Sequence, residues 1–250
     1  LITYMRTDST RVASIAKHEA SNYIHENYGA EYAAIKPVKG KLPEGAQDAH
    51  EAIRPTSVYR TPAKMKQYLT PNQYKLYNLI WSRFVASQMT AEVIDTMSVN
   101  LQQNGVDFRA NGSKVKFPGF TKVYKRGTEK DNLLPELTEG DKAKMIKDDP
   151  AQHFTQPPAR YTEAALIKTL EENGVGRPST YAPTLDTIQR RYYVRLVSRH
   201  FEPTELGEIV NRIIEKQFPD IVNVQFTADI EGKLDEIEEG KQNWINVVDK

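Results

Sequence analysis

The amino-acid sequence predicts an α+β fold that is mostly helical and contains more than one domain. Apolar residues recur at helical spacing before residue 90 and again after residue 160, whereas the stretch between them alternates with a period of two. The pair Pro157-Pro158 interrupts any continuous helix at the start of the last stretch. We therefore expect a helical, a β-rich and a second mixed segment, with boundaries near Thr90 and residues 153–158.

Residues 1–90 predict a short strand and two long helices. Residues 1–5 alternate weakly, as a strand does, and residues 8–10 carry side-chain oxygens that can cap a helix. We expect this helix to run to about Tyr28 and to end at Gly29, which tolerates a left-handed conformation. Residues 70–73 form a capping box with a first-turn proline, so a second long helix is expected to start there.

The middle stretch predicts several strands. Apolar residues alternate over 93–101 and over 106–110, and the following pair Asn111-Gly112 is typical of a hairpin turn. A polar loop at 125–135 is expected next, with a further strand at 143–147.

The last stretch predicts two short helices, at 162–172 and 179–191, on either side of a glycine turn and followed by a two-stranded ribbon within 194–203. This order is the outline of a winged-helix DNA-binding domain, although any small α+β subdomain gives the same pattern. Thr204 caps a further amphipathic helix, and 226–250 supply more helix. We expect the apolar stripes of these helices to be core.

Composition excludes several classes of protein. The 250 residues include 34 Lys plus Arg, 33 Asp plus Glu and no Cys, which excludes a disulfide framework and a thiolate metal site. No apolar run approaches the roughly 18 residues that a membrane span needs, and no signal peptide opens the chain. We therefore expect a cytoplasmic protein. The chain starts at Leu1 inside a motif-like run, so we expect it to be part of a longer polypeptide.

Charge is unevenly distributed along the chain. Residues 201–250 hold 12 acidic against 5 basic side chains, whereas 157–200 hold 7 basic against 4 acidic. This separation is compatible with a phosphate-binding face opposite an acidic one, and also with ordinary surface charge. We interpret the acidic run 235–239 as a solvated helix face and expect no metal site in the chain.

Tyr4 and Arg6 form the first candidate site. On a strand, residues two apart face the same side, so a phenol and a guanidinium lie together. A nearby cation stabilises the phenolate and the charge that develops on an attacked phosphate, which suits phosphoryl transfer to tyrosine. The alternative is half-buried packing beside a surface charge.

His50 is the second candidate. It lies in the run 48–56, flanked by acidic residues and followed by Arg54, and its imidazole can donate a hydrogen bond to a phosphate oxygen. A lone histidine is also commonly a hydrogen-bonded structural residue.

A third group of polar and aromatic residues lies at two predicted helix N-termini. Unpaired amides and the helix dipole attract phosphate there, arginine adds charge-assisted hydrogen bonds, and tyrosine can stack on an unpaired base. The candidate nucleic-acid contacts are Arg160, Thr162, Arg177, Ser179, Thr180 and Tyr181.

Taken together, three motifs in this order resemble those of the type IA DNA topoisomerases, specifically the bacterial topoisomerase I branch. Residues 2–10 resemble the active-site tyrosine segment, 48–56 the histidine segment and 176–181 a later signature. The resemblance covers essentially the whole chain. Met5 and the order Ala-His-Glu-Ala around His50 favour topoisomerase I over topoisomerase III.

The resemblance implies a mechanism. Tyr4 attacks a phosphodiester of single-stranded DNA and forms a 5′-phosphotyrosyl link, another strand passes, and religation follows, so that negative supercoils are relaxed without ATP. Arg6 neutralises the scissile phosphate, His50 forms a hydrogen bond near the cleavage site, and the third group of residues lines the single-strand path.

The resemblance also implies a division into domains and a set of absent parts. Residues 1–88 correspond to most of the tyrosine-bearing domain, 89–156 to part of a β-rich arch and 157–250 to a winged-helix-like domain. The family's Toprim domain, which carries the Mg²⁺-binding acids and a partner glutamate, and its zinc ribbons are not in these residues. We expect the fragment to bind single-stranded DNA without relaxing supercoiled DNA and to associate with the nucleoid. A non-catalytic single-strand-binding module is the competing hypothesis.

Overall fold

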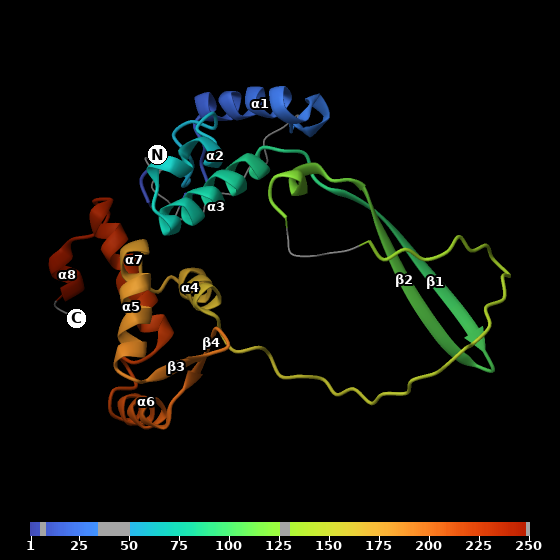
Figure 1. The fold of residues 1–250 in the computed structure, drawn as a ribbon. Coiled ribbons are helices and arrows are strands. Elements are labelled where there is room, and N and C mark those ends of the chain that lie inside the picture. The colour runs from blue at the N-terminus through green and yellow to red at the C-terminus, as the bar shows by residue number, and fades with distance from the viewer. Residues whose placement is uncertain (6–8, 35–50, 126–130, 249–250) are drawn as a thin grey trace. The chain divides into compact units, whose positions relative to one another are not determined.

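The computed structural model describes residues 1–5, 9–34, 51–125 and 131–248. Over these residues the chain is α+β, as the sequence predicts. It separates into two compact units, Leu1–Asp148 and Asp149–Lys250. Figure 1 shows helices in both units and a long two-stranded ribbon in the first.

Unit 1 combines helices with one antiparallel pair of strands. Its elements are α1 (Ser14–Tyr28), η1 (Ala30–Tyr32), α2 (Pro62–Met65), η2 (Lys66–Tyr68), α3 (Pro71–Ser87), β1 (Val93–Gln103), β2 (Val106–Phe117) and η3 (Gly119–Lys122).

The core of unit 1 lies between α1 and α3. Ile24 and Val85 are completely buried, and the ring of Trp81 packs edge-on against Tyr23 with centres 5.7 Å apart. The indole Nε1 of Trp81 donates a hydrogen bond of 2.9 Å to the carbonyl of Val58. The segment that precedes α2 is therefore tied to the core.

The first helix begins later than predicted. α1 starts at Ser14, and its N-cap residue is Ala13, which has no capping side chain. The backbone N–H of Ala13 instead donates to Oε1 of Glu51 at 3.1 Å. Of the predicted caps at residues 8–10, the first lies outside the described residues. The helix ends at Gly29 as predicted, with φ of +112°.

The start of α3 confirms the predicted capping box. The hydroxyl of Thr70 accepts from the N–H of Gln73 at 3.4 Å, and the side chain of Gln73 accepts from the N–H of Thr70 at 3.0 Å. Pro71 occupies the first helical turn, where its missing N–H costs no hydrogen bond.

The turn of the hairpin was predicted at the wrong Asn-Gly pair. β1 and β2 are joined at Asn104-Gly105, whose φ values of 52° and 79° are those of a tight hairpin turn. Gly112 lies inside β2 opposite Met97. A Cβ there would lie 2.8 Å from Cγ of Leu134, so glycine at this position permits close packing rather than a turn.

The strand predicted at 143–147 is absent. Residues 141–150 are exposed and have no regular secondary structure. A strand needs a hydrogen-bonded partner, and the segment after β2 pairs with it at a single described bridge, between Ser113 and Asn132. The alternating residues at 143–147 therefore do not form a strand, because no described strand pairs with them.

Unit 2 follows the predicted order of helix, turn, helix and hairpin. Its elements are α4 (Glu163–Glu172), α5 (Pro178–Arg190), β3 (Val194–Val197), β4 (His200–Pro203), α6 (Glu205–Gln217), α7 (Val224–Glu238) and α8 (Trp244–Val248). The N–H of Phe201 donates to the carbonyl of Tyr161 at 2.8 Å, and Thr162 forms a bridge with His200. The segment before α4 thus lies along the edge of β4.

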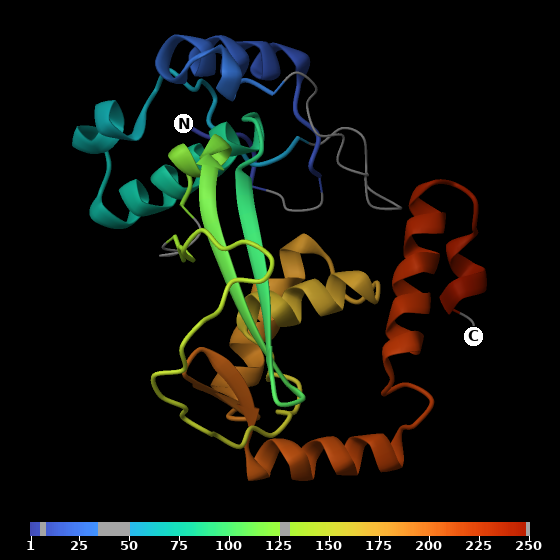
Figure 2. The same cartoon turned by 90° about the vertical axis from the view of Figure 1, so that its right-hand side faces the viewer.

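The apolar stripe of α6 is not core, contrary to prediction. Leu206, Ile209 and Ile213 are 49%, 46% and 55% exposed. Figure 2 shows α7 turning away from the axis of α6. Nothing among the described residues of unit 2 buries this face.

None of the described helices combines the length and apolar character that a membrane crossing requires.

Candidate active site and nucleic-acid interface

Tyr4 lies on an extended segment that is bound to the segment of the second motif. The N–H of Thr3 donates to the carbonyl of Arg54 at 2.9 Å, and the N–H of Thr56 donates to the carbonyl of Leu1 at 2.9 Å. Two motifs that are distant in sequence therefore lie side by side in unit 1.

The side chain of Thr3 strengthens this connection. Its hydroxyl donates to the carbonyl of Ala52 at 2.8 Å and accepts from the N–H of Arg54 at 3.0 Å. Because the residue directly before Tyr4 is held by backbone and side chain together, the position of the Tyr4 backbone is fixed relative to the second motif.

Glu51 and Arg54 fix the second motif in turn. Nη2 of Arg54 donates to Oε2 of Glu51 at 2.7 Å, and the two side chains are only 12% and 21% exposed. Oε1 of the same carboxylate accepts from the N–H of Ala13 at the start of α1. This shielded ion pair, which we call the Glu51–Arg54 clamp, joins the second motif to the first long helix.

The phenol of Tyr4 is open to solvent. Its side chain is 78% exposed, so the hydroxyl is not enclosed in the core of unit 1. Arg6 and His50 lie outside the described residues, and their distances to the phenol stay a prediction. Described residues close to them in sequence, 1–3 and 52–56, are hydrogen-bonded to each other.

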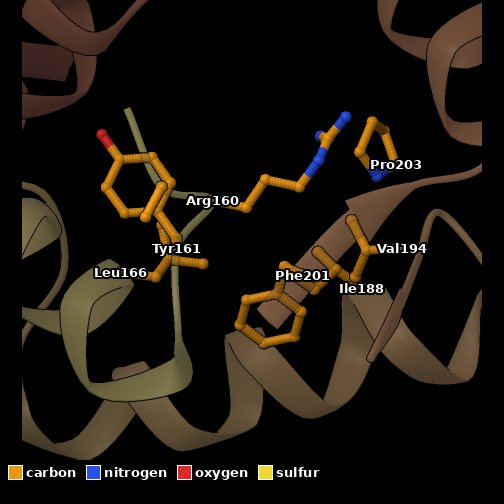
Figure 3. Close-up of a pocket in the computed structure, with 8 residues that line it drawn as sticks. Arg160, Tyr161, Leu166, Ile188, Val194, Phe201 and Pro203 are labelled. Carbon is orange, nitrogen blue, oxygen red and sulfur yellow. The ribbon is translucent and has the colours of Figure 1, made fainter. Parts of the chain in front are cut away.

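In unit 2, Arg160 and Thr162 lie at the approach to α4. The hydroxyl of Thr162 accepts from the N–H of Ala165 at 3.2 Å and so caps the helix. The guanidinium of Arg160 has no ion pair or hydrogen bond with any described residue, and it lines a surface cleft (Figure 3). A cation held beside a helix N-terminus suits phosphate binding.

Arg177 is the N-cap of α5, at the predicted helix N-terminus, and its guanidinium contacts α7. Its Nη1 lies 3.2 Å from Glu231, and its Nη2 lies 2.8 Å from Asp235, both on α7. Partial burial lowers the pKa of Arg177, but the hydrogen bond with Asp235 and the charge of Glu231 outweigh it and raise the pKa above its ordinary value. Asp235 is exposed, as predicted for the acidic run, but it holds this arginine.

The remaining predicted contacts lie in the first turn of α5. The hydroxyl of Thr180 accepts from the N–H of Arg177 at 2.9 Å, and Ser179 is exposed. The ring of Tyr181 is only 8% exposed and packs against the turn at Gly176, so its faces are not available for stacking on a base. This group therefore divides into exposed hydroxyls and residues that support the fold.

Comparison with known proteins shows the family of the chain. The model of the DNA topoisomerase family matches residues 1–249. The chain belongs to the DNA topoisomerase family. The full-length topoisomerase I of Thermotoga maritima is similar in structure, with a TM-score of 0.83 and 40% sequence identity. The resemblance to bacterial type IA topoisomerases is thus confirmed.

The chain corresponds to less than half of this Thermotoga topoisomerase. The match covers 99% of the chain but 40% of the Thermotoga protein. The activity of a complete topoisomerase is therefore a proposal for this chain.

This topoisomerase chain does not assemble a metal site among its described residues, since no group of three or more Asp, Glu or His side chains comes together there. The resemblance places Mg²⁺ on the Toprim domain, which is not in these residues, so no residue of the chain is assigned to hold it.

Sequence reasoning missed two connections in this topoisomerase chain. Glu51 and Arg54 lie outside any helix, so no local pattern predicts their ion pair or the bond from Ala13 to Glu51. The contact of Arg177 with α7 joins residues 54 and 58 positions apart, so no local pattern predicts it.

Proposed function

We propose that the chain is the tyrosine-bearing part of a type IA topoisomerase that cleaves and rejoins one DNA strand. The oxygen of Tyr4 attacks the phosphorus, a 5′-phosphotyrosyl bond forms, and the 3′-oxygen of the preceding nucleotide leaves and takes up a proton. Since one phosphodiester replaces another, religation needs no ATP. The observation that supports this proposal is the exposed phenol of Tyr4 on a segment held against the histidine motif.

Arg6 and His50 are proposed to act on the same phosphate. A guanidinium stabilises the charge on the phosphoryl oxygens, and an imidazole donates a hydrogen bond to them. The hydrogen bonds that join Leu1–Thr3 to residues 52–56 support this role, because the chain continues from these two segments to Arg6 and to His50.

The single-strand path is proposed to use polar groups at the start of α4 and α5, of which Arg160, Ser179 and Thr180 are exposed and Thr162 is half-buried. Arg160, Thr162, Ser179 and Thr180 lie at the N-terminal ends of α4 and α5, where unpaired amides attract phosphate. We assign Arg177 to positioning, since α7 already holds its guanidinium. By family resemblance, residues 157–250 are proposed to be the winged-helix-like domain, and the hairpin of β1 and β2 is proposed to belong to the arch.

The complete enzyme is proposed to include a Toprim domain that supplies Mg²⁺ and a glutamate beside Tyr4. The uncovered stripe of α6 supports the presence of further polypeptide, because a large apolar face is commonly an interaction surface. Negatively supercoiled DNA is the proposed substrate, and the nucleoid is the proposed location.

The proposal is tested by Tyr4→Phe in the full-length protein. The wild type is expected to yield DNA that stays attached after denaturation, and the variant none, because phenylalanine has no nucleophilic oxygen. Tyr68→Phe, a change at another exposed tyrosine, serves as the control and is expected to retain the adduct. An undiminished adduct with Tyr4→Phe excludes Tyr4.

A protein that binds DNA without cleaving it would give a different result in this test. A non-catalytic module binds single strands with a steep salt dependence but yields no adduct, even when a Toprim fragment and Mg²⁺ are supplied.

A further inference from the structure

Unit 2 contains a cleft whose walls are mostly apolar. Its volume is about 360 Å³, at the small end of the range of ligand sites. Figure 3 shows side chains from several elements around it. The apolar ones are Leu166 of α4, Ile188 of α5, Val194 of β3, and Phe201 and Pro203 of β4.

One side of the cleft is a fixed piece of chain. Ala159, Arg160 and Tyr161 line it, and the hydrogen bond from the N–H of Phe201 to the carbonyl of Tyr161 holds them along β4. In Figure 3, the side chain of Arg160 extends toward Pro203, above the apolar residues. The cleft therefore combines a preformed apolar floor with a cation.

The charge of this cation is not neutralised within the described chain. Arg160 is exposed, and it has no hydrogen bond or ion pair with a described residue. The elements that form the walls carry two more such arginines, Arg191 directly after α5 and Arg199 in the turn between β3 and β4. An occupant with a negative charge beside an apolar face matches these features.

We propose that the cleft binds one unstacked nucleobase of a single strand while Arg160 holds the adjacent phosphate. A nucleotide has a flat, largely apolar ring next to an anionic group, which is the combination that the cleft presents. Unpaired bases gain free energy when their faces leave water, whereas a duplex base has its faces covered by neighbours. This inference rests on the proposed single-strand binding and adds a base-binding subsite to it.

The test measures how the 250-residue chain binds a fluorescently labelled dT₁₂ oligonucleotide by anisotropy at a fixed low salt concentration. In a series of oligonucleotides, each base in turn is replaced by an abasic spacer, which keeps the phosphates. We expect one position, or two adjacent ones, at which loss of the base weakens binding about fivefold or more, as for other stacked bases.

Ala159→Leu fills the cleft without touching a core side chain, because Ala159 is exposed. We expect it to weaken binding of the intact oligonucleotide about fivefold and to abolish the further effect of the abasic position. Ala151→Leu is the matched control, since Ala151 is exposed in the same irregular segment and does not line the cleft. It is expected to bind as the wild type does, and circular dichroism checks that both variants fold.

Four results would overturn the inference. Binding that is insensitive to every abasic position shows that only phosphates are held, and leaves the proposed function intact. An abasic effect that persists in Ala159→Leu places the base elsewhere. Absence of salt-dependent binding removes both the base subsite and the proposed single-strand path. A variant that binds DNA normally but fails to assemble with a Toprim fragment assigns the cleft to a protein contact.

Discussion

At the residue scale, the Glu51–Arg54 clamp makes a specific contribution to stability. Arg54→Gln removes a charge-assisted hydrogen bond and leaves a partly buried carboxylate without its partner. We expect the free energy of unfolding of unit 1 to fall by about 1–3 kcal/mol. Urea denaturation of the chain measures this change.

Arg60→Gln is the control for that substitution. Arg60 is exposed, and its guanidinium donates a hydrogen bond of 2.9 Å to the hydroxyl of Thr56. A loss of about 0.5 kcal/mol or less is expected, as for other surface changes. Equal effects of the two substitutions would contradict a structural role for the clamp.

Tyr23 gives the stability of unit 1 a dependence on alkaline pH. Burial, and then the neighbouring phenol of Tyr28, raise the pKa of Tyr23 to about 12 from 10.0. Between these values the unfolded chain loses this proton while the folded chain retains it, so the free energy of unfolding falls as pH rises. The contribution is fully present below pH 10.

Denaturation curves at several pH values compare the wild type with Tyr23→Phe. We expect the variant to lose less stability between pH 10 and 12, since it has no proton to lose at this position. Tyr68→Phe, at an exposed site, is expected to follow the wild type. Identical pH slopes for wild type and Tyr23→Phe would show that burial of this phenol does not affect stability.

At the element scale, Gly207 sets how closely α6 approaches the backbone of Tyr193, which lies between α5 and β3. A Cβ at this position would lie 2.0 Å from the carbonyl oxygen of Tyr193, which belongs to the backbone and cannot rotate away. We expect Gly207→Ala to destabilise unit 2 by about 1–3 kcal/mol, as overpacking does. Thermal unfolding followed by circular dichroism measures the effect.

Gly232→Ala is the matched control, since Gly232 also lies inside a helix but a Cβ there meets nothing within 4 Å. It is expected to stabilise α7 by about 0.5–1 kcal/mol through helix propensity. If both alanine variants are stabilised, α6 does not pack on Tyr193 in solution.

Features of the fold that depend on neighbouring residues could be predicted from the sequence, whereas features that depend on distant residues could not. The capping box at Thr70 and the cap at Thr204 were predicted because each depends on neighbouring residues alone. The hairpin turn was misplaced because two Asn-Gly pairs carry the same local signal, whereas in the structure Gly112 lies inside β2 opposite Met97. The start of α1 depends on Glu51, far away in sequence.

The same division applies to the candidate site. The sequence identified Tyr4 and the motif that lies beside it, because their residue types carry the chemistry. It assigned Arg177 and Tyr181 to DNA from their types and their place at a predicted helix N-terminus. In the structure, the guanidinium of Arg177 is bound to α7 and Tyr181 is buried. Residue type indicates what a side chain can do, but long-range contacts determine whether it is available.

At the scale of the whole molecule, the chain matches 40% of the Thermotoga protein. We therefore expect the 250-residue chain to bind single-stranded DNA with an affinity that falls steeply with salt, but not to relax a negatively supercoiled plasmid with or without Mg²⁺. Gel mobility after incubation with the plasmid measures relaxation. Relaxation by the chain alone would contradict the need for a Toprim domain.

The central claim is that Tyr4 becomes covalently joined to a cleaved strand. The most direct measurement is mass spectrometry of peptides from the full-length protein, trapped with a single-stranded oligonucleotide by denaturation in Mg²⁺-containing buffer and digested with nuclease and protease. The account predicts a nucleotide mass on the peptide that contains Tyr4. A nucleotide attached to any other of the 13 tyrosines, with the Tyr4 peptide unmodified, contradicts it.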